Sequence, residues 1–236
     1  MLRSSAVLSR RAVPDVPDLA NWDEFLDAQV GAGALHPLEA SLARSLPAAR
    51  RATFVAGRVA LRDAMAQLAD VPLTGNTPVL RTHRGAPLLP PQITGSVTHK
   101  STLAMAAVAP RQGTLQHVGL DLEHRPTEAD LQRPSVARKI LTAREFATLE
   151  QFEDASLAQR EHVLVHFALK EAVYKAIDPF VERYVRFTEV ELNLSDASDV
   201  QVTLHLPEPA VSAVRVEAHW HTDGDWIVAA AYSHLR

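Results

Sequence analysis

Two apolar helical segments of this chain carry the same order of residue types, and such a match bears directly on the fold. Residues 60–64 read ALRDA and residues 168–172 read ALKEA, so a cation followed by a carboxylate stands between apolar residues in both. Each segment is followed by a strand pattern that ends in an alanine-rich run. Alanine-rich helices can resemble one another by chance, but a duplication would mean two similar α/β halves.

The hydrophobic pattern divides the chain into helical and strand-like segments. Pro47 suits the first turn of a helix, where its missing N–H costs no hydrogen bond, and Thr142 and Glu145 are spaced as a capping box. Helical patterns cover residues 37–70, 131–155 and 161–177, and strand patterns cover residues 93–98, 103–109, 116–123, 189–194, 200–206, 214–220 and 226–232. The expected domains are a disordered tail at 1–20, an N-terminal half at 21–115 and a C-terminal half at 116–236.

Composition limits the class of protein. Of the 236 residues, 47% are hydrophobic and 22% charged, which is typical of a soluble globular protein. The net charge of -4 gives no reason to expect nucleic acid or an anionic membrane as a partner. The absence of cysteine excludes disulfides, thiolate zinc sites and cysteine nucleophiles. No apolar run is long enough to span a bilayer, and residues 1–11 lack the apolar stretch of a secretory signal, so we expect a cytoplasmic protein.

The strand pattern at residues 116–123 carries two carboxylates, Asp121 and Glu123. At i and i+2 on a strand these side chains leave the same face, while the apolar residues between them point into the core. Two like charges side by side are unfavourable unless a positive group lies between them, and Mg²⁺ bound through oxygen is a natural partner. The alternative is an amphipathic strand with a solvated acidic face.

The apolar helix at residues 161–177 carries a second group of charges. Glu171 and Lys175 lie at i and i+4 and therefore share a face, with Lys170 at its edge. One interpretation is a solvated helix face with a weak ion pair. The other is a third metal carboxylate, Glu171, beside two ammonium groups that meet phosphate oxygens.

The order of these motifs resembles the signature of the 4′-phosphopantetheinyl transferase superfamily. Residues 119–123 (GLDLE) and 167–175 (FALKEAVYK) carry its acidic strand and charged helix. Upstream, residues 84–87 (RGAP), 95–99 (GSVTH) and 57–62 (GRVALR) look like its basic loop, its Ser-x-Thr-His element and its arginine helix. The spacing is most similar to the surfactin-type and enterobactin-synthetase component D-like members. The resemblance implies an α+β fold of two pseudo-symmetric α/β halves, each a helix packed on a small, mostly antiparallel sheet, in one catalytic unit.

The resemblance also implies an activity, in which 4′-phosphopantetheine moves from coenzyme A to a serine of an apo acyl or peptidyl carrier protein and 3′,5′-ADP is released. Asp121, Glu123 and Glu171 would hold Mg²⁺ against the pyrophosphate, and the serine proton would pass to Glu171, directly or through a water. The implied catalytic residues are Asp121, Glu171 and Lys175. The implied coenzyme A contacts are Arg58, Arg62, Arg84, Ser96, Thr98, His99, Lys170 and Lys175.

The chain departs from the family pattern at three positions. Phe167 stands where many relatives have tryptophan, Lys100 follows His99 where a small residue or cysteine is frequent, and Arg84 replaces the more frequent lysine. None of these changes removes a required chemical group.

Two readings from other classes compete with the transferase. The first is a coenzyme A-binding protein without turnover, against which the intact carboxylates and Lys175 argue. The second is a metal-dependent phosphohydrolase, which leaves residues 84–87 and 95–99 unexplained. The chain is also too long for the single-domain synthase type, a trimer of short chains, so we expect a monomer. The component D-like pattern favours a siderophore or other secondary-metabolite pathway.

Overall fold

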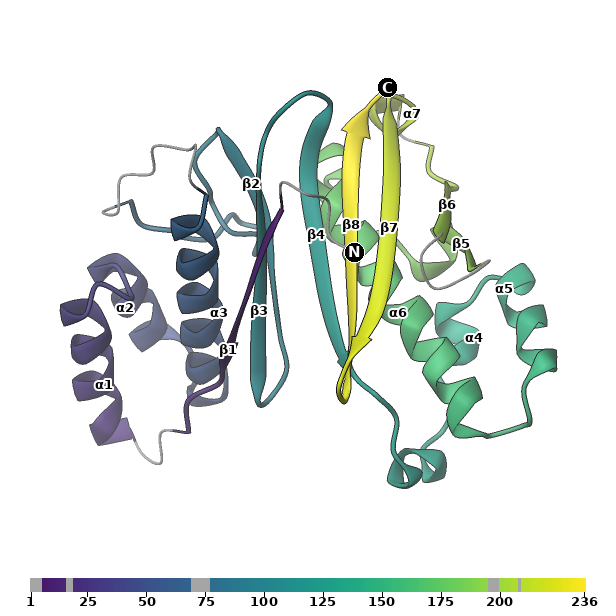
Figure 1. Ribbon diagram of the computed structural model, residues 1–236, viewed down its shortest axis with the longest axis horizontal. Coiled ribbons are helices and arrows are strands. Elements are labelled where there is room, and N and C mark those ends of the chain that lie inside the picture. The colour runs from purple at the N-terminus through teal and green to yellow at the C-terminus, as the bar shows by residue number, and fades with distance from the viewer. Residues whose placement is uncertain (1–5, 16–18, 69–76, 195–199, 208) are drawn as a thin grey trace. The chain divides into compact units, whose positions relative to one another are not determined.

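The chain forms two compact units that divide between Arg111 and Gln112. The computed structural model describes residues 6–15, 19–68, 77–194, 200–207 and 209–236 (Figure 1). The sequence predicts a division at 115/116; Leu115 is the first residue of a strand, Leu115–His124, in the second unit. No helix in the described ranges is long and apolar enough to cross a membrane.

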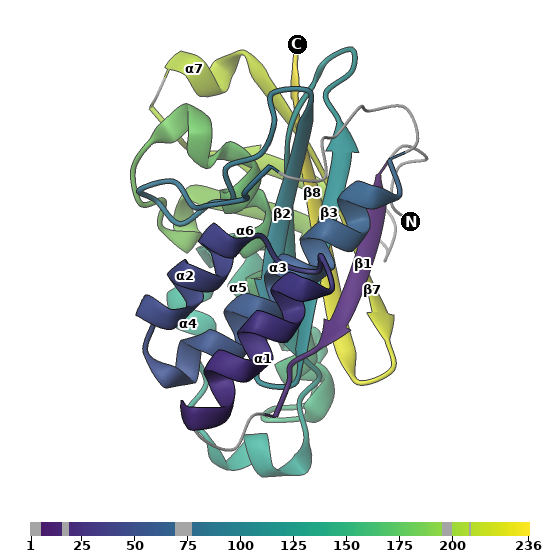
Figure 2. The same cartoon turned by 90° about the vertical axis from the view of Figure 1, so that its left-hand side faces the viewer.

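The N-terminal unit is a three-stranded antiparallel sheet with helices on one face (Figure 2). Helix α3 packs on strands β3 and β1, and its apolar face joins the strands in one core. A second cluster, formed with Trp22 and Leu26, packs α1 and α2 onto α3. The elements are β1 (Val7–Ala12), α1 (Leu19–Gly31), α2 (Pro37–Ser45), α3 (Ala48–Ala66), β2 (Ile93–His99) and β3 (Leu103–Pro110).

Strand β1 shows that the disordered tail expected at residues 1–20 is wrong for residues 7–12. This segment pairs antiparallel with β3 along its full length, from Val7 opposite Val108 to Ala12 opposite Leu103. Strand β1 forms backbone hydrogen bonds with the edge of β3 that does not pair with β2. In addition, the Arg11 guanidinium forms an ion pair with Asp63 of α3. A long-range partner therefore orders a segment that carries a serine and two arginines beside its apolar residues. Residues 1–5 and 16–18 of the expected tail lie outside the described residues.

The C-terminal unit is a five-stranded antiparallel sheet in the order β4-β8-β7-β6-β5, with the long helix α6 packed on β4 and β8. The inner face of α6 and the alanines of β8 form its main core. Gly224, at φ +59, permits the tight turn of the β7–β8 hairpin. The elements are β4 (Leu115–His124), α6 (Leu157–Val181), η3 (Phe187–Glu189), β5 (Val190–Leu194), β6 (Val200–Leu204), α7 (Pro209–Ser212), β7 (Val214–Asp223) and β8 (Trp226–Leu235).

The polar segment at residues 131–155 is not one helix, contrary to expectation. Pro134 and the cap at Thr142 divide it, because proline cannot continue a helix and a capped residue starts a new one. The expected capping box is confirmed: the Thr142 side chain accepts from the Glu145 N–H, and Glu145 accepts from the Thr142 N–H. The short helices are η1 (Glu128–Gln132), α4 (Ala137–Ile140), α5 (Ala143–Ala147) and η2 (Thr148–Gln151).

The two units share one chain path, which confirms the pseudo-symmetric α+β fold. In each, a first strand leads through short helices to a long helix and then to a hairpin. The first strand pairs with the second strand of that hairpin, so β1-β3-β2 corresponds to β4-β8-β7. Strands β5 and β6 are an addition to the C-terminal unit that extends its sheet beyond β7.

Candidate functional site

The acidic strand β4 carries Asp121 and Glu123 on the face that contacts α6. Gly119, two residues earlier on the same face, lies so close to the helix that a Cβ there would overlap the carbonyl oxygen of Ala172. Asp121 and Glu123 are 6% and 9% exposed. Both carboxylates are therefore buried, which rules out the alternative of a solvated acidic face.

Lys175 of α6 joins the helix to this strand. Its Nζ donates to Oδ1 of Asp121 at 2.7 Å and to the carbonyl oxygen of Leu120 at 2.7 Å. The Lys175 side chain is 28% exposed and so keeps contact with solvent. An ammonium beside a buried carboxylate, open on one side, can also meet an anionic ligand.

Glu171, the third predicted metal ligand, lies one turn before Lys175 on α6 and is partly exposed. It lines a small crevice with Tyr174, Tyr184 and Arg186. Carboxylate oxygens suit a hard cation such as Mg²⁺, so the donor set of Asp121, Glu123 and Glu171 fits the metal chemically. Among the described residues, however, no three His, Asp or Glu side chains lie close enough together to hold an ion.

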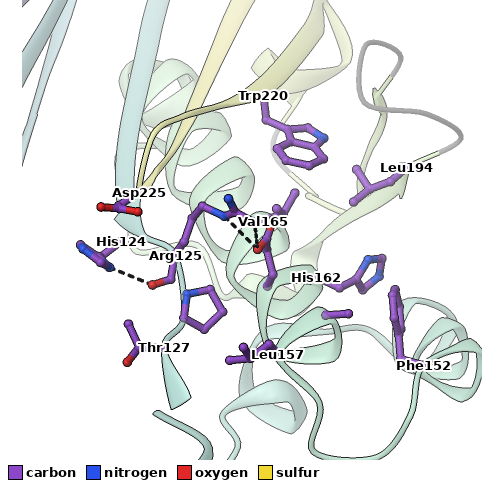
Figure 3. A pocket seen from close by; sticks show the side chains of 13 residues that line it. His124, Arg125, Thr127, Phe152, Leu157, His162, Val165, Leu194, Trp220 and Asp225 are labelled. Atoms are coloured by element: carbon purple, nitrogen blue, oxygen red, sulfur yellow. Dashed lines mark hydrogen bonds and ion pairs between the residues drawn. The ribbon is translucent and has the colours of Figure 1, made fainter. Parts of the chain in front are cut away.

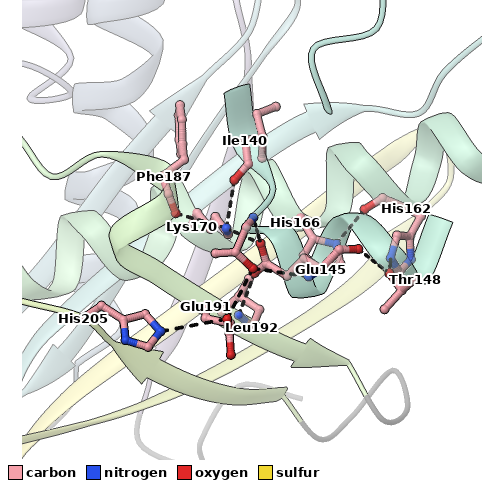
Figure 4. A network of polar contacts seen from close by, with 11 residues as sticks. Ile140, Glu145, Thr148, His162, His166, Lys170, Phe187, Glu191, Leu192 and His205 are labelled. Carbon is pink, nitrogen blue, oxygen red and sulfur yellow. Dashed lines mark hydrogen bonds and ion pairs between the residues drawn. The ribbon is translucent and has the colours of Figure 1, made fainter. Parts of the chain in front are cut away.

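Lys170, predicted to lie near the pyrophosphate, has a buried ammonium group with three acceptors. Its side chain is 0% exposed, and Nζ donates to Glu145 Oε2 at 2.6 Å and to the carbonyl oxygens of Ile140 and Phe187 at 2.9 and 3.0 Å (Figure 4). An ammonium group has three N–H donors, and these three acceptors use them all. Burial lowers the pKa of Lys170, and the hydrogen bond and charge of Glu145 oppose that shift.

Arg58 of α3 has a buried guanidinium group, and one of its N–H donors has no partner among the described residues. Nη2 donates to the carbonyl oxygen of Leu80 at 3.3 Å, and the guanidinium carbon lies 4.7 Å from the centre of the Phe54 ring. Its Nε has no hydrogen-bond partner among the described residues. Burial is the main reason that the pKa of Arg58 is lowered to about 10, with nearby Arg81 and Arg62 adding to the effect. Such a group gains from an anionic partner.

Arg62 and Arg84, predicted to bind the nucleotide end, lie in different settings. Arg62, also on α3, donates from Nε and Nη2 to the buried Glu39 at 2.8 Å each. Arg84 is partly exposed in a tight turn, in which the Thr82 N–H donates to the Ala86 carbonyl oxygen at 2.8 Å. The Arg84 side chain is therefore within reach of solvent.

The Ser-x-Thr-His element forms the end of strand β2. Ser96 and Thr98 are both 5% exposed and share one face of the strand. His99 is partly exposed and lies on the opposite face, with Val97. The structure thus places the two hydroxyl groups together and separates them from the imidazole.

A pocket of about 600 Å³ in the C-terminal unit was not foreseen from the sequence (Figure 3). It lies under the first half of α6, with an apolar lining that includes Phe152, Leu157 and Trp220. The Arg125 guanidinium in its wall pairs with Glu161 at 2.8 Å. The described residues that line it include none of those predicted for the site. Its residues come from well-separated segments, so no local motif marks it.

Two histidines lie one turn apart on α6 next to this pocket. The rings of His162 and His166 are 4.5 Å apart, and Nδ1 of His166 lies 2.9 Å from the His162 carbonyl oxygen. Burial is the main cause that lowers the pKa of each histidine to about 4. Both imidazoles are therefore neutral at physiological pH.

Comparison with known proteins covers both units. A family model described as the 4′-phosphopantetheinyl transferase N-terminal domain matches residues 38–109, and one described as the 4′-phosphopantetheinyl transferase superfamily matches residues 117–231. The 4′-phosphopantetheinyl transferase Svp of Streptomyces mobaraensis is 32% identical over 206 residues, which cover 83% of this chain and 77% of Svp.

Two further relatives match over a shorter stretch. The 4′-phosphopantetheinyl transferase Npt of Nocardia iowensis is 31% identical over 66% of this chain and 65% of its own length. The 4′-phosphopantetheinyl transferase PptT of Mycobacterium tuberculosis is 30% identical over 69% of this chain and 66% of its own length. The chain thus spans just under two thirds of each of these two relatives.

Solved structures similar to this chain match about half of it. The ACPS–CoA complex of Chronobacterium ammoniagenes has a TM-score of 0.41 and 21% identity and covers 53% of this chain and 99% of its own. The holo-ACP-synthase of Plasmodium yoelii has a TM-score of 0.43 and 17% identity, with the same two coverages.

Proposed function

Because this chain belongs to the 4′-phosphopantetheinyl transferase superfamily, we propose that it transfers 4′-phosphopantetheine from coenzyme A to a serine of an apo acyl or peptidyl carrier protein. The observation that carries the proposal is the contact of Lys175 Nζ with Asp121 Oδ1 at 2.7 Å, beside Glu123. It joins the acidic strand to the charged helix within the region that the superfamily model matches. With a divalent ion on the carboxylates, the Lys175 ammonium group could donate to a pyrophosphate oxygen.

The proposed reaction is a displacement at phosphorus. The serine Oγ forms a bond to the phosphorus that bears the pantetheine, and the bond from that phosphorus to the bridging oxygen breaks. The bridging oxygen leaves with 3′,5′-ADP, and the serine proton passes to Glu171. Lys175 would offset negative charge on the pyrophosphate as the bond breaks. Phosphoryl-type transfer needs mainly such positioning and charge stabilisation.

We propose that Asp121, Glu123 and Glu171 hold a Mg²⁺ ion. The ion would neutralise negative charge on the pyrophosphate and on the departing 3′,5′-ADP. This ion is proposed because two carboxylates are buried on one face of β4. Two buried like charges are unfavourable without a compensating cation. Lys175 supplies one such charge near Asp121, and a divalent ion would supply more.

The nucleotide end of coenzyme A is assigned to the N-terminal unit. Arg58 is favoured because its buried guanidinium has an unused N–H among the described residues, and Arg84 because its turn leaves it accessible. His99 joins them as a donor to phosphate oxygen. Ser96 and Thr98 lie on the other face of β2 and are left out of this assignment.

We further propose that the protein is a cytoplasmic monomer. The chain already holds two units with the same chain path. Siderophore or other secondary-metabolite carrier proteins are the first partners to test.

Intact mass spectrometry of an apo carrier protein tests the proposal. The carrier protein is incubated with this chain, coenzyme A and Mg²⁺, and a gain of one phosphopantetheine group is expected. Addition of EDTA should prevent the gain, and excess Mg²⁺ should restore it. Fatty-acid, polyketide, peptide and siderophore carriers are compared in the same assay.

Each other outcome points to a different function. Binding of coenzyme A without a mass gain on any carrier would favour a coenzyme A-binding protein without turnover. Release of inorganic phosphate from simple phosphate esters, without a mass gain, would favour a phosphohydrolase.

A further inference from the structure

Each unit contains a buried glutamate that accepts hydrogen bonds from a cation of its long helix. In the N-terminal unit, Glu39 is 0% exposed and accepts from Nε and Nη2 of Arg62 at 2.8 Å each. In the C-terminal unit, Glu145 is 1% exposed and accepts from Lys170 Nζ at 2.6 Å. Arg62 and Lys170 are the matching cations of the ALRDA and ALKEA segments.

The remaining partners of the two glutamates also correspond. Each glutamate is the third residue of a short helix and closes a capping box with the residue before that helix. In both, Oε2 accepts from the capping N–H and from the helix cation, and Oε1 accepts from a backbone N–H that follows the long helix in sequence. These backbone donors are His36 (2.9 Å) and Val79 (2.7 Å) for Glu39, and Thr142 (2.6 Å) and Leu192 (2.7 Å) for Glu145.

The sequence spacing is nearly the same in both units. Glu39 precedes Arg62 by 23 residues, and Glu145 precedes Lys170 by 25. The same set of partners for the glutamate, namely a capping N–H, a cation of the long helix and a later backbone N–H, thus recurs at the same place in both units. It is part of the repeated design and not a local feature of one helix.

We infer that Glu39 and Glu145 are equivalent positioning residues, each of which clamps the long helix of its unit to the segments before and after it. The helix held by Glu145 carries Glu171 and Lys175, and the helix held by Glu39 carries Arg58. The link from the clamp to catalysis rests on the proposed function, whereas the clamp itself does not.

The inference reverses the role predicted for Lys170. A phosphate could reach its ammonium group only if Glu145 and the two carbonyl oxygens lost their donor in a buried setting. A buried charge left without its partner is strongly destabilising, so this exchange is unfavourable. Lys170 and Arg62 therefore act through the helices that they hold.

Two lysines of α6 provide the test, because only one of them is held by the clamp. In the full chain, Lys170→Met should lower the thermal unfolding midpoint by about 10 °C, since it breaks a buried ion pair. It should leave the coenzyme A dissociation constant, measured by titration calorimetry below the midpoint, within about threefold of wild type. Lys175→Met should weaken coenzyme A binding by at least about tenfold. Its midpoint should fall by less than that of Lys170→Met, because the Lys175 side chain is partly exposed while that of Lys170 is buried.

The rate of carrier modification shows whether Lys170 only stabilises the fold or also positions the catalytic residues of α6. Lys170→Met should lower kcat for carrier modification by about tenfold or more at an unchanged KM for coenzyme A. Lys170→Arg, which introduces the cation that the other unit uses, should restore part of both the midpoint and kcat. An unchanged kcat in a destabilised Lys170→Met protein would overturn the positioning role. An unchanged midpoint with tenfold weaker coenzyme A binding would overturn the clamp and make Lys170 a phosphate ligand.

Failure of the transferase proposal and failure of the clamp can be told apart. If the wild-type chain modifies no carrier protein, the transferase proposal fails while the unfolding midpoints still decide the clamp. If Lys170→Met does not fold, Lys170→Arg takes its place, with coenzyme A affinity near wild type expected. Weaker binding at an unchanged midpoint in that variant would overturn the inference. In the other unit, Arg62→Met should also lower the midpoint, and an unchanged midpoint there would remove the equivalence.

Discussion

The ammonium nitrogen of Lys175 lies 2.7 Å from Oδ1 of Asp121, so that the charged helix and the acidic strand meet through one ion pair. The sequence predicts that Lys175 shares a helix face with Glu171. In the folded chain, Lys175 forms an ion pair with a carboxylate of the strand, Asp121. The two motifs that define the candidate site thus converge in a single contact.

Asp121→Asn tests this contact. The substitution keeps the shape of the side chain but removes the charge that Lys175 and the proposed Mg²⁺ ion need. We expect transfer to fall by at least about 100-fold, because several kcal/mol of charge stabilisation are lost. The thermal midpoint should change little, since Lys175 is partly exposed and keeps the carbonyl oxygen of Leu120. Asp154→Asn, at an exposed carboxylate, is the matched control and should transfer at the wild-type rate.

Glu171→Gln should separate metal binding and proton transfer from folding. The residue is partly exposed, so its loss of charge should leave the unfolding midpoint unchanged while transfer drops by at least about 100-fold. The half-saturating Mg²⁺ concentration, measured in the carrier-modification assay, should also rise. Glu150→Gln changes an exposed carboxylate in the same way and serves as the control. Near-normal transfer by Glu171→Gln would show that neither role belongs to this residue.

Gly119→Ala should destabilise the C-terminal unit. A Cβ at this position would overlap the carbonyl oxygen of Ala172, and a helix backbone cannot move aside as a flexible side chain can. We expect a loss of about 3 kcal/mol in the free energy of unfolding, measured by denaturant titration. Gly31→Ala is the matched control, because the added Cβ meets nothing within 4 Å there. Equal stability of the two variants would contradict the close approach of β4 to α6.

His166 should make the stability of the protein depend on pH. Burial lowers its pKa to about 4 in the folded chain from 6.5, so below pH 6.5 the unfolded chain binds a proton that the folded chain does not. Stability is therefore lost as pH falls from about 6.5 toward 4, by about 3 kcal/mol for this group. Between pH 7.5 and 4.5, the urea unfolding free energy of His166→Gln should drop by roughly 2 kcal/mol less than that of wild type. Identical pH profiles would show that the imidazole is not held neutral.

Arg58→Met should weaken coenzyme A binding without a loss of stability. The substitution keeps the apolar stem of the side chain and removes a buried guanidinium whose Nε has no partner among the described residues. The unfolding midpoint should stay the same or rise, because a desolvated charge is lost. The coenzyme A dissociation constant should increase by about tenfold or more, as a charged hydrogen bond to phosphate is removed. Arg50→Met, an exposed change on the same helix, should alter neither quantity.

Local patterns were sufficient to predict several parts of this molecule. The strand with Asp121 and Glu123, the long helix with Glu171 and Lys175, and the capping box of Thr142 and Glu145 all lie where the sequence places them. Each of these features depends on the spacing of residues within one segment, and such spacing is visible in the sequence.

The tertiary structure alone decided what the charged residues of that helix contact. Lys170 and Lys175 are similar in sequence context, yet one ammonium group is buried against Glu145 and the other is partly exposed beside Asp121. The segments that enclose Lys170 come from α4, α5 and η3, and those that meet Lys175 come from β4. Strand β1 shows the same principle, because its order depends on the free edge of β3. Burial and pairing are set by segments distant in the chain, and the periodicity of one segment carries no information about them.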